Sequence, residues 1–128
     1  MSLIEQARTA QLAAYAPYSH YRVGCALETV DGAVYTGCNI ENASYGATLC
    51  AERVAIFKAV SDGHRRFRRI VIATDATSPA SPCGLCRQVL GEFCDPEFEV
   101  ILCGANEQER RFSLAQLFPH PFNQSSLT

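Results

Sequence analysis

The 128-residue sequence predicts an α/β fold, a three-layer α/β/α sandwich around a central mixed five-stranded sheet. A strong hairpin signal, Asp31-Gly32, lies between two strand-like segments. Two short apolar segments of the buried-strand type follow it and alternate with helix-like segments. Because a hairpin followed by strand–helix–strand crossovers forms one mixed sheet, we expect helices on both of its faces.

The predicted elements begin with a helix and the hairpin. In chain order they are a helix at 2–14, strands at 22–30 and 33–40, a helix at about 48–61, a strand at 68–76, a helix at 83–93, a strand at 98–104, a weak strand within 105–113 and a short helix near 114–117. The first helix has apolar side chains at helical spacing, with Ser2 as its N-cap and Pro17 beyond its end. The stretch 22–30 alternates in polarity as a strand does, and 33–40 is the strand that returns after the Asp31-Gly32 turn.

The later elements are bounded by turn signals. Asp62-Gly63 closes the second helix, and the third begins just after Pro82. The two strands of the second half are short, continuous apolar runs, as expected for central strands covered on both faces. The polar segment 105–113 is expected to hold a turn and the weak last strand that completes the sheet.

The bulk composition fits one domain, predicted to span residues 1–128, because 48% of the residues are hydrophobic and 19% are charged. The net charge of −2 is not the basic surplus that dedicated nucleic-acid binders usually carry. Glu5 and Arg8 interrupt the N-terminal apolar residues, so no signal peptide is predicted, and no apolar run is long enough to span a bilayer. We therefore expect a cytoplasmic protein with no nucleic-acid partner and no membrane association.

Seven cysteines are many for this length, and an odd number without a secretion signal argues against a disulfide framework. Cys83 and Cys86 form a C-x-x-C pair in the first turn of a predicted helix, and Cys50 lies in the first turn of the preceding helix. Since βα junctions gather at one edge of an α/β sheet, the three sulfurs can meet there. Zn²⁺ prefers about four tetrahedral ligands, and three protein ligands leave a position open for water, as in catalytic sites. The remaining cysteines are interpreted as small buried residues: Cys25, Cys38, Cys94 and Cys103.

Two charged residues near Cys50 fit this metal chemistry. Glu52 can lie beside the metal without binding it. Its carboxylate can then take a proton from the activated water and transfer it to the substrate. The alternative is a first-turn glutamate that the helix dipole favours. Three thiolates and Zn²⁺ leave a surplus negative charge, and Arg53 can compensate it by donating to the sulfurs. Arg87 is a weaker candidate for the same role.

At these residues the sequence closely resembles the cytidine deaminases, specifically the small homotetrameric group with three cysteine ligands. The known signature of zinc deaminases is a metal ligand, any residue and Glu, followed later by Pro-Cys-x-x-Cys. Here it reads CAE at 50–52 and PCGLC at 82–86. The segments 15–27, 37–63 and 81–93 also match, so the resemblance covers nearly the whole chain.

The resemblance implies one Zn²⁺ per subunit, a nucleoside substrate and a homotetramer whose sites are completed across subunits. Asn39 and Glu41 match positions that hydrogen-bond the ribose, notably its 3′-hydroxyl, and such groups suit a hydroxyl but repel a phosphate. Tyr21 falls where the family commonly has Phe, lining the base and sugar pocket. The other matches are backbone contacts to the pyrimidine at Ala51 and Cys83, residues that reach a neighbouring subunit's site at Ala43 and Tyr45, and an aromatic that closes the pocket across the interface at Phe122.

The function that follows is hydrolytic deamination of cytidine and 2′-deoxycytidine to uridine nucleosides and ammonia, a reaction of pyrimidine salvage. Water activated by zinc attacks C4, while Glu52 moves protons to ring N3 and to the departing amine. Three alternatives stay open: a structural zinc module closed by a fourth cysteine such as Cys38, a deaminase of polynucleotides, and a deaminase of modified cytosine nucleosides. The sequence does not rank cytidine against deoxycytidine.

Overall fold

The computed structural model describes residues 1–106 and 108–127 and contains the helices and strands that the sequence predicts. In chain order they are α1 (Leu3–Gln11), β1 (Val23–Thr29), β2 (Val34–Cys38), the 3₁₀ helix η1 (Tyr45–Ala47), α2 (Ala51–Ser61), β3 (Phe67–Thr74), α3 (Gly84–Phe93), β4 (Glu99–Cys103), β5 (Glu109–Ser113), α4 (Leu114–Leu117) and the 3₁₀ helix η2 (Gln124–Leu127). The weak last strand is confirmed as β5. Gly32, at a φ of 92°, confirms the hairpin turn, and Gly63, at 99°, confirms the end of α2.

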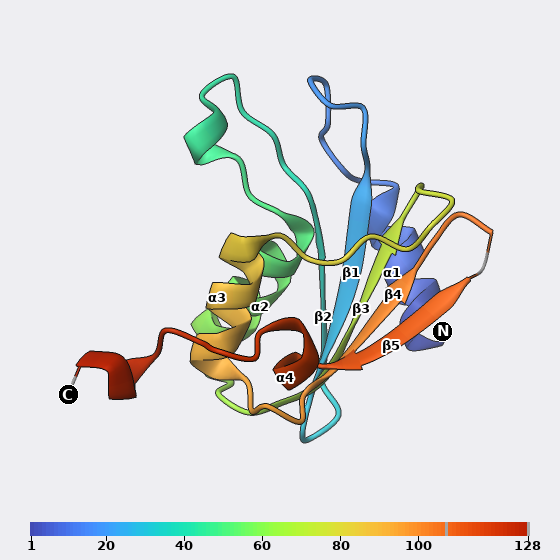
Figure 1. Ribbon diagram of the computed structural model, residues 1–128. Helices are drawn as coiled ribbons and strands as arrows, with labels where there is room; N and C mark the ends of the chain where they lie inside the picture. Colours follow the sequence, from blue (N-terminus) through green and yellow to red (C-terminus); the bar gives the residue numbers. More distant parts are fainter. Residues whose placement is uncertain (107, 128) are drawn as a thin grey trace.

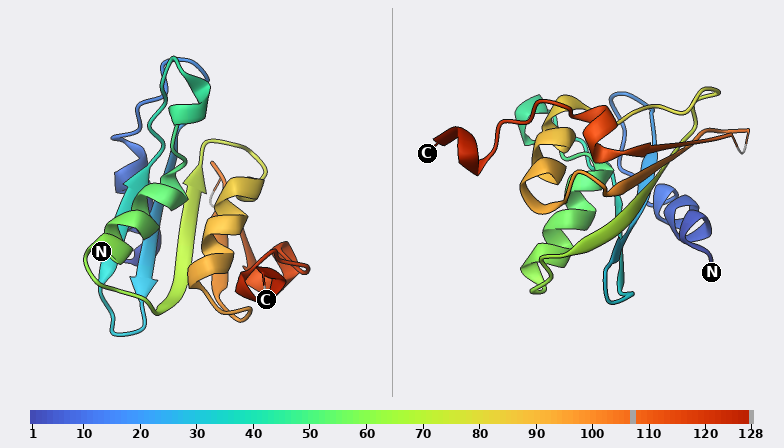
Figure 2. Two further views of the ribbon diagram at one scale, coloured as in Figure 1. Left: turned by 90° about the vertical axis from the view of Figure 1, so that its left-hand side faces the viewer. Right: turned by 60° about the horizontal axis from the view of Figure 1, so that its bottom comes forward.

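The strands form one sheet in the order β2-β1-β3-β4-β5 (Figure 1). β3 and β4 run parallel, whereas the other neighbouring pairs are antiparallel, so the predicted mixed five-stranded sheet is confirmed. Figure 2 shows α1 on one face of the sheet and α2 and α3 on the other. The three-layer arrangement is therefore confirmed as well. Among the helices of residues 1–106 and 108–127, none has the length and hydrophobicity needed to cross a bilayer.

The core is divided in two because side chains alternate between the faces of the sheet. Strand residues on one face pack in a common cluster with α2 and α3: Cys25, Leu27, Ile70, Ile72, Val100 and Leu102. Strand residues on the other face pack with Ala7 of α1: Ala26, Val71, Ala73, Ile101 and Cys103. The prediction of buried cysteines is thus confirmed for Cys25 and Cys103. It is wrong for Cys38, at the end of an edge strand, and for Cys94, at the C-cap of α3, which are only partly buried.

Two glycines let helices lie directly on the sheet. A Cβ atom at Gly24 of β1 would lie 2.3 Å from the carbonyl oxygen of Ala7 in α1. A Cβ atom at Gly37 of β2 would lie 2.4 Å from the carbonyl oxygen of Ala51 in α2. The absence of a side chain at Gly37 thus lets the N-terminal turn of α2 lie close against β2, at the edge of the sheet.

Two helix boundaries differ from the prediction where long-range backbone contacts intervene: α1 ends early and α2 begins late. α1 stops at Gln11, and the amide of Tyr15 soon afterwards donates to the carbonyl of Asn39 at 3.0 Å. α2 begins at Ala51, because Leu49 exchanges two backbone hydrogen bonds with Ile40, at 2.9 and 3.0 Å. Leu49 is thereby held in an extended conformation, and the residue after it becomes the N-cap.

Candidate active site

The three predicted metal ligands meet where two helices begin. Cys50 is the N-cap of α2 and Cys83 is the N-cap of α3. Each therefore lies just before the first helical turn, whereas the sequence predicted each within it. Cys86 lies within the first turn of α3. The Sγ atoms of Cys50 and Cys83 are 3.7 Å apart, those of Cys83 and Cys86 are 3.4 Å apart, and all three lie within 4.8 Å of one another. Within the described residues this metal-competent group does not include Cys38.

The spacing and the charge of this group fit a zinc ion. Tetrahedral Zn–S bonds of about 2.3 Å place two sulfurs about 3.8 Å apart, close to the separations observed. Hydrogen bonds from Cys86, and then from Arg53 and Cys83, lower the pKa of the Cys50 thiol to about 5. The same contact with Cys50, together with burial, raises the pKa of Cys86. The negative charge of one thiolate therefore disfavours ionisation of the next thiol. A divalent cation among the sulfurs offsets this repulsion.

Glu52 is buried beside the sulfurs, with 4% of its surface exposed. Burial raises the pKa of its carboxyl to about 7, and the negative charge of Cys50 adds to this effect. A glutamate that served only the helix dipole would keep its charge in water, so burial argues against that alternative. Glu52 is thus a carboxyl group that can hold or release a proton near neutral pH.

Arg53 donates a hydrogen bond to one of the clustered sulfurs. Its Nη2 donates to Cys50 Sγ at 3.6 Å and to the carbonyl oxygen of Thr48 at 3.2 Å. The hydrogen bonds of Arg87 go to the carbonyl oxygens of Pro82 and Leu117. Those contacts tie the start of α3 to the end of α4, which is a different role from the charge compensation suggested for Arg87.

One cavity of about 260 Å³ brings most of the predicted site residues together. It lies among the ends of β1, β2 and β3 and the segments that lead into α2 and α3. The predicted residues in its lining are Tyr21, Asn39, Glu41, Cys50, Ala51, Glu52 and Cys83. Ser19 and Thr74 also line it and were not predicted. The hydroxyl of Thr74 is buried. Thr74 is the last residue of β3, and no motif around it in the sequence marks it as a site residue.

The Asn39 amide connects two parts of the cavity wall. Its Oδ1 accepts from the amide of Val23 at 2.9 Å, and its Nδ2 donates to the carbonyl oxygen of Tyr21 at 2.8 Å. One amide proton and one lone pair of the side chain stay available beyond these bonds. Asn39 therefore fixes the segment that carries Tyr21 and keeps capacity for a ligand.

Glu41 is anchored by the same segment. Its Oε1 accepts from the amides of Tyr18 and Ser19, at 3.0 and 3.1 Å, and its Oε2 accepts from the Ser19 hydroxyl. These bonds, with the Ser19 hydroxyl as the largest cause, lower the pKa of Glu41. Ser19 was not among the predicted site residues; its one signal is a serine two residues before Tyr21, a spacing typical of a local side-chain turn.

Three of the predicted substrate-binding residues do not line this cavity. Tyr45 lines an adjoining hollow of about 310 Å³ together with Tyr18 and Glu41. Phe122 is 57% exposed, and its carbonyl oxygen accepts from Gln88 of α3 at 2.8 Å. Ala43 is not among the residues that line either space. A contribution of these three residues to a neighbouring subunit's site stays a prediction, which a single chain does not test.

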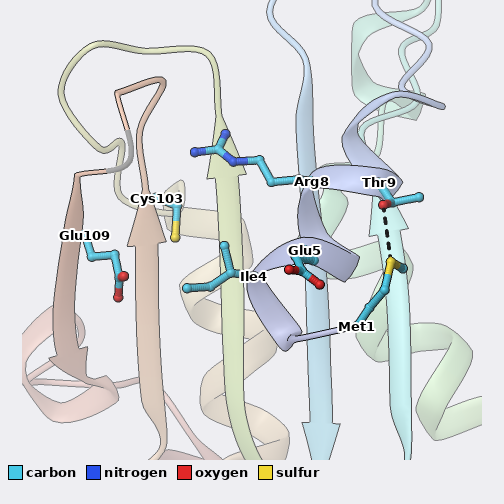
Figure 3. Close-up of a pocket in the computed structure, with 7 residues that line it drawn as sticks. All are labelled: Met1, Ile4, Glu5, Arg8, Thr9, Cys103 and Glu109. Atoms are coloured by element: carbon cyan, nitrogen blue, oxygen red, sulfur yellow. Dashed lines mark hydrogen bonds between the residues drawn. The ribbon is translucent and has the colours of Figure 1, made fainter.

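A larger cavity, of about 570 Å³, lies beside α1 and the ends of β4 and β5, on the opposite face of the sheet (Figure 3). Arg8 extends from α1 along its wall, and its guanidinium donates to the carbonyl oxygens of Thr74, at 3.0 Å, and Gly104. Arg8 thus holds the ends of β3 and β4 together. This arrangement supports the segment that leads from β3 to Cys83.

Comparisons with known proteins agree with the geometry. The family model of the cytidine and deoxycytidylate deaminase zinc-binding region matches residues 1–103. A cytidine deaminase of Sporosarcina psychrophila is 45% identical over 126 residues, which cover 98% of this chain and 93% of that protein. A crystal structure of cytidine deaminase from Burkholderia pseudomallei has a TM-score of 0.92 and 46% identity, covering 95% of this chain and 100% of that one. A more distant relative, a blasticidin-S deaminase of Bacillus cereus, is 28% identical over 133 residues, covering 98% of this chain and 93% of that protein.

Proposed function

Because this chain belongs to the zinc-dependent cytidine deaminase family, we propose that its cavity takes free cytidine and 2′-deoxycytidine and releases their 4-amino groups as ammonia. One observation carries the proposal: Glu52 lines the same cavity as two of the clustered sulfurs and as the sugar-side residues Asn39 and Glu41. A proton carrier, a metal-competent group and polar groups for a sugar are thus combined in one small space. That combination supports a nucleoside substrate.

The chain's own residues supply the proton transfers. A zinc ion held by Cys50, Cys83 and Cys86 would supply an activated water, with a pKa lowered toward about 7. Glu52 accepts a proton from that water, because burial brings the pKa of its carboxyl to about 7. Glu52 then delivers protons to ring N3 and to the departing amine. The water oxygen stays on C4 as the carbonyl, one of its protons stays on N3, and the other leaves with ammonia.

The polar wall supports a nucleoside over a nucleotide or a polynucleotide. The negative charge of Glu41 is kept by three hydrogen bonds and would repel a phosphate placed beside it. The chain has no tryptophan and a net charge of −2, whereas binding of a single strand depends on basic grooves and stacking aromatics. The structural zinc alternative is disfavoured, because Cys38 is not part of the sulfur group in the described residues.

The test is the turnover of wild type and Glu52→Gln, followed by the loss of cytosine absorbance. Wild type should deaminate both nucleosides, and Glu52→Gln should keep its zinc while kcat falls by about 10²- to 10⁴-fold. Glu97→Gln, at an exposed loop position, is the matched control and should retain full activity. A zinc-loaded Glu52→Gln enzyme with wild-type turnover would overturn the proposed role.

A second candidate substrate is a modified cytosine nucleoside, which the similarity to a blasticidin-S deaminase over nearly the whole chain supports. Blasticidin S, cytidine 5′-monophosphate and single-stranded DNA are therefore assayed beside the two nucleosides. We expect the highest kcat/KM with the free nucleosides. Higher kcat/KM with any of the other three would replace the proposed substrate class.

Four further expectations stay predictions: the homotetramer, the cytoplasmic location, the role in pyrimidine salvage and the single domain spanning 1–128. The homotetramer is supported by the partner-facing roles that the resemblance implies for Tyr45 and Phe122, both of which are exposed in the single chain. Light scattering of the zinc-loaded protein should give the mass of four copies. A monomer with full activity would contradict sites completed across subunits.

A further inference from the structure

We propose that Ser19 is a positioning residue, which fixes the Glu41 carboxylate so that one remaining lone pair selects a donor hydroxyl on the sugar. This inference rests on the proposed function, because it concerns how the same cavity recognises its nucleoside. It adds to that function a residue with no assigned role and a reason for specificity toward an unmodified 3′-hydroxyl.

The hydrogen bonds of Glu41 leave little freedom to its carboxylate. Oε1 accepts from the amides of Tyr18 and Ser19, and Oε2 accepts from the Ser19 hydroxyl. A carboxylate has about four lone-pair sites, so three are used and one, on Oε2, is left for a ligand. Because an ionised carboxylate only accepts, the ligand group placed there has to donate a hydrogen. A sugar hydroxyl satisfies this requirement, whereas an ether or a phosphate oxygen does not.

The Ser19 hydroxyl is itself fixed from both sides. Its single proton goes to Glu41, and its oxygen accepts from the amide of Tyr21 at 3.0 Å. His20, between these residues, has a φ of 57°, and its amide donates to the carbonyl of Ala16 at 3.0 Å. This left-handed conformation, uncommon for a residue other than glycine, closes the turn that brings the Tyr21 amide back to Ser19. Ser19 therefore couples Tyr21 and Glu41, which both line the cavity.

The charge of Glu41 agrees with this arrangement. The hydrogen bond from the Ser19 hydroxyl is the largest cause that lowers the pKa of Glu41. The amides of Ser19 and Tyr18 and the charge of His20 lower this pKa further. The carboxylate is therefore ionised at neutral pH and keeps its acceptor character. Without the hydroxyl, Oε2 would lose its fixed partner and could turn toward water.

The alternative is that Ser19 only stabilises the loop. In that case its removal would weaken the binding of every nucleoside to the same extent. Positioning of Glu41 instead predicts a loss that depends on the 3′-hydroxyl of the substrate. The two roles are therefore separated by comparing cytidine with 3′-deoxycytidine.

The experiment measures kcat and KM of wild type, Ser19→Ala and Ser19→Thr with both substrates. A hydrogen bond to a charged group stabilises by about 1.5–3 kcal/mol, so wild type should prefer cytidine by about 10- to 100-fold in kcat/KM. Ser19→Ala should lose most of this preference through a raised KM for cytidine, with kcat and the values for 3′-deoxycytidine nearly unchanged. Ser19→Thr, which keeps the hydroxyl, should restore most of the preference.

A double-mutant cycle adds an independent readout. Glu41→Gln should also remove the preference, and Ser19→Ala in the Glu41→Gln background should have little further effect, since both changes remove one interaction. Equal losses on both substrates, full preference in Ser19→Ala, or additive effects in the cycle would each overturn the inference. Failure of the proposed function looks different, because wild type would then not deaminate cytidine at all.

Discussion

Cys50 Sγ and Cys83 Sγ lie 3.7 Å apart, although each residue caps a different helix and 33 positions separate them. The N-termini of α2 and α3 are thus brought together at a pair of sulfur atoms. A cation bound between them links the two helices as well as serving the reaction. Metal affinity and the stability of this part of the fold should therefore change together.

Cys83→Ala should lose its zinc, its activity and part of its free energy of unfolding. Binding stabilises a folded chain by about 4 kcal/mol when free ligand exceeds its dissociation constant 1,000-fold, and this variant should forfeit a stabilisation of that order. Zinc content and urea denaturation on the same sample are the measurements. Cys38→Ala is the control and should keep one zinc per chain; loss of zinc from it would indicate a closed structural site.

Arg53→Gln should lower kcat by about 10- to 100-fold with little change in KM, as is common for residues that support metal ligands. Arg53 Nη2 donates to Cys50 Sγ at 3.6 Å, so its removal leaves more negative charge on the sulfurs and opposes deprotonation of the activated water. The kcat–pH profile at full zinc occupancy should lose activity first on its acid side. Arg53→Lys should recover part of the rate, and wild-type turnover by Arg53→Gln at neutral pH would contradict this role.

Gly37→Ala should destabilise the protein and damage the site together. The new Cβ would lie 2.4 Å from Ala51 O and 2.8 Å from Ala55 N, both backbone atoms of α2, so the helix start next to Cys50 has to move. Overpacking of this kind costs about 1–3 kcal/mol, measurable by urea denaturation, and kcat/KM should fall as well. Gly46→Ala, where nothing lies within 4 Å of the new Cβ, should change the free energy of unfolding by less than about 0.5 kcal/mol. Equal effects of the two substitutions would contradict the close approach of α2.

The fold could be predicted from the sequence where local signals carry it. Asp31-Gly32 marked the hairpin, continuous apolar runs marked the buried strands β3 and β4, and β5 was predicted only as a weak strand in a polar segment. The sulfur group was predictable because Cys83 and Cys86 are close in sequence, and because the helix starts that carry Cys50 and Cys83 gather at one edge of an α/β sheet. Most of these signals lie within short stretches of the sequence.

The remaining features depend on contacts between distant segments. Cys50 is an N-cap because Leu49 pairs with Ile40, a bridge that no local periodicity reveals. Ser19 reaches Glu41 across 22 positions, and Arg8 reaches Gly104 across 96. Hydrogen bonds of this kind follow from the packed tertiary structure, so they become visible only after the sheet and its loops have been placed.

A last prediction concerns alkaline pH. Tyr35 of β2 donates its hydroxyl to Asp62 at the C-cap of α2, and its ring lies edge-on to His64 with centroids 5.3 Å apart. The hydrogen bond to Asp62, with some burial, raises the pKa of Tyr35 to about 12, above the ordinary value near 10. A raised pKa in the folded state means that the neutral phenol stabilises the fold. This contribution is complete below about pH 10 and is lost as the pH rises to about 12.

Tyr35→Phe should therefore unfold more easily than wild type at pH 8, and the difference should shrink between about pH 10 and pH 12. Urea denaturation across this range measures it, and the difference in phenolate absorbance between the two proteins reports the titration of Tyr35 directly. Asp62→Asn removes the acceptor carboxylate and should bring that titration back toward about pH 10. A stability difference that stays constant up to pH 12 would contradict the link, because the hydrogen bond cannot survive ionisation of its donor.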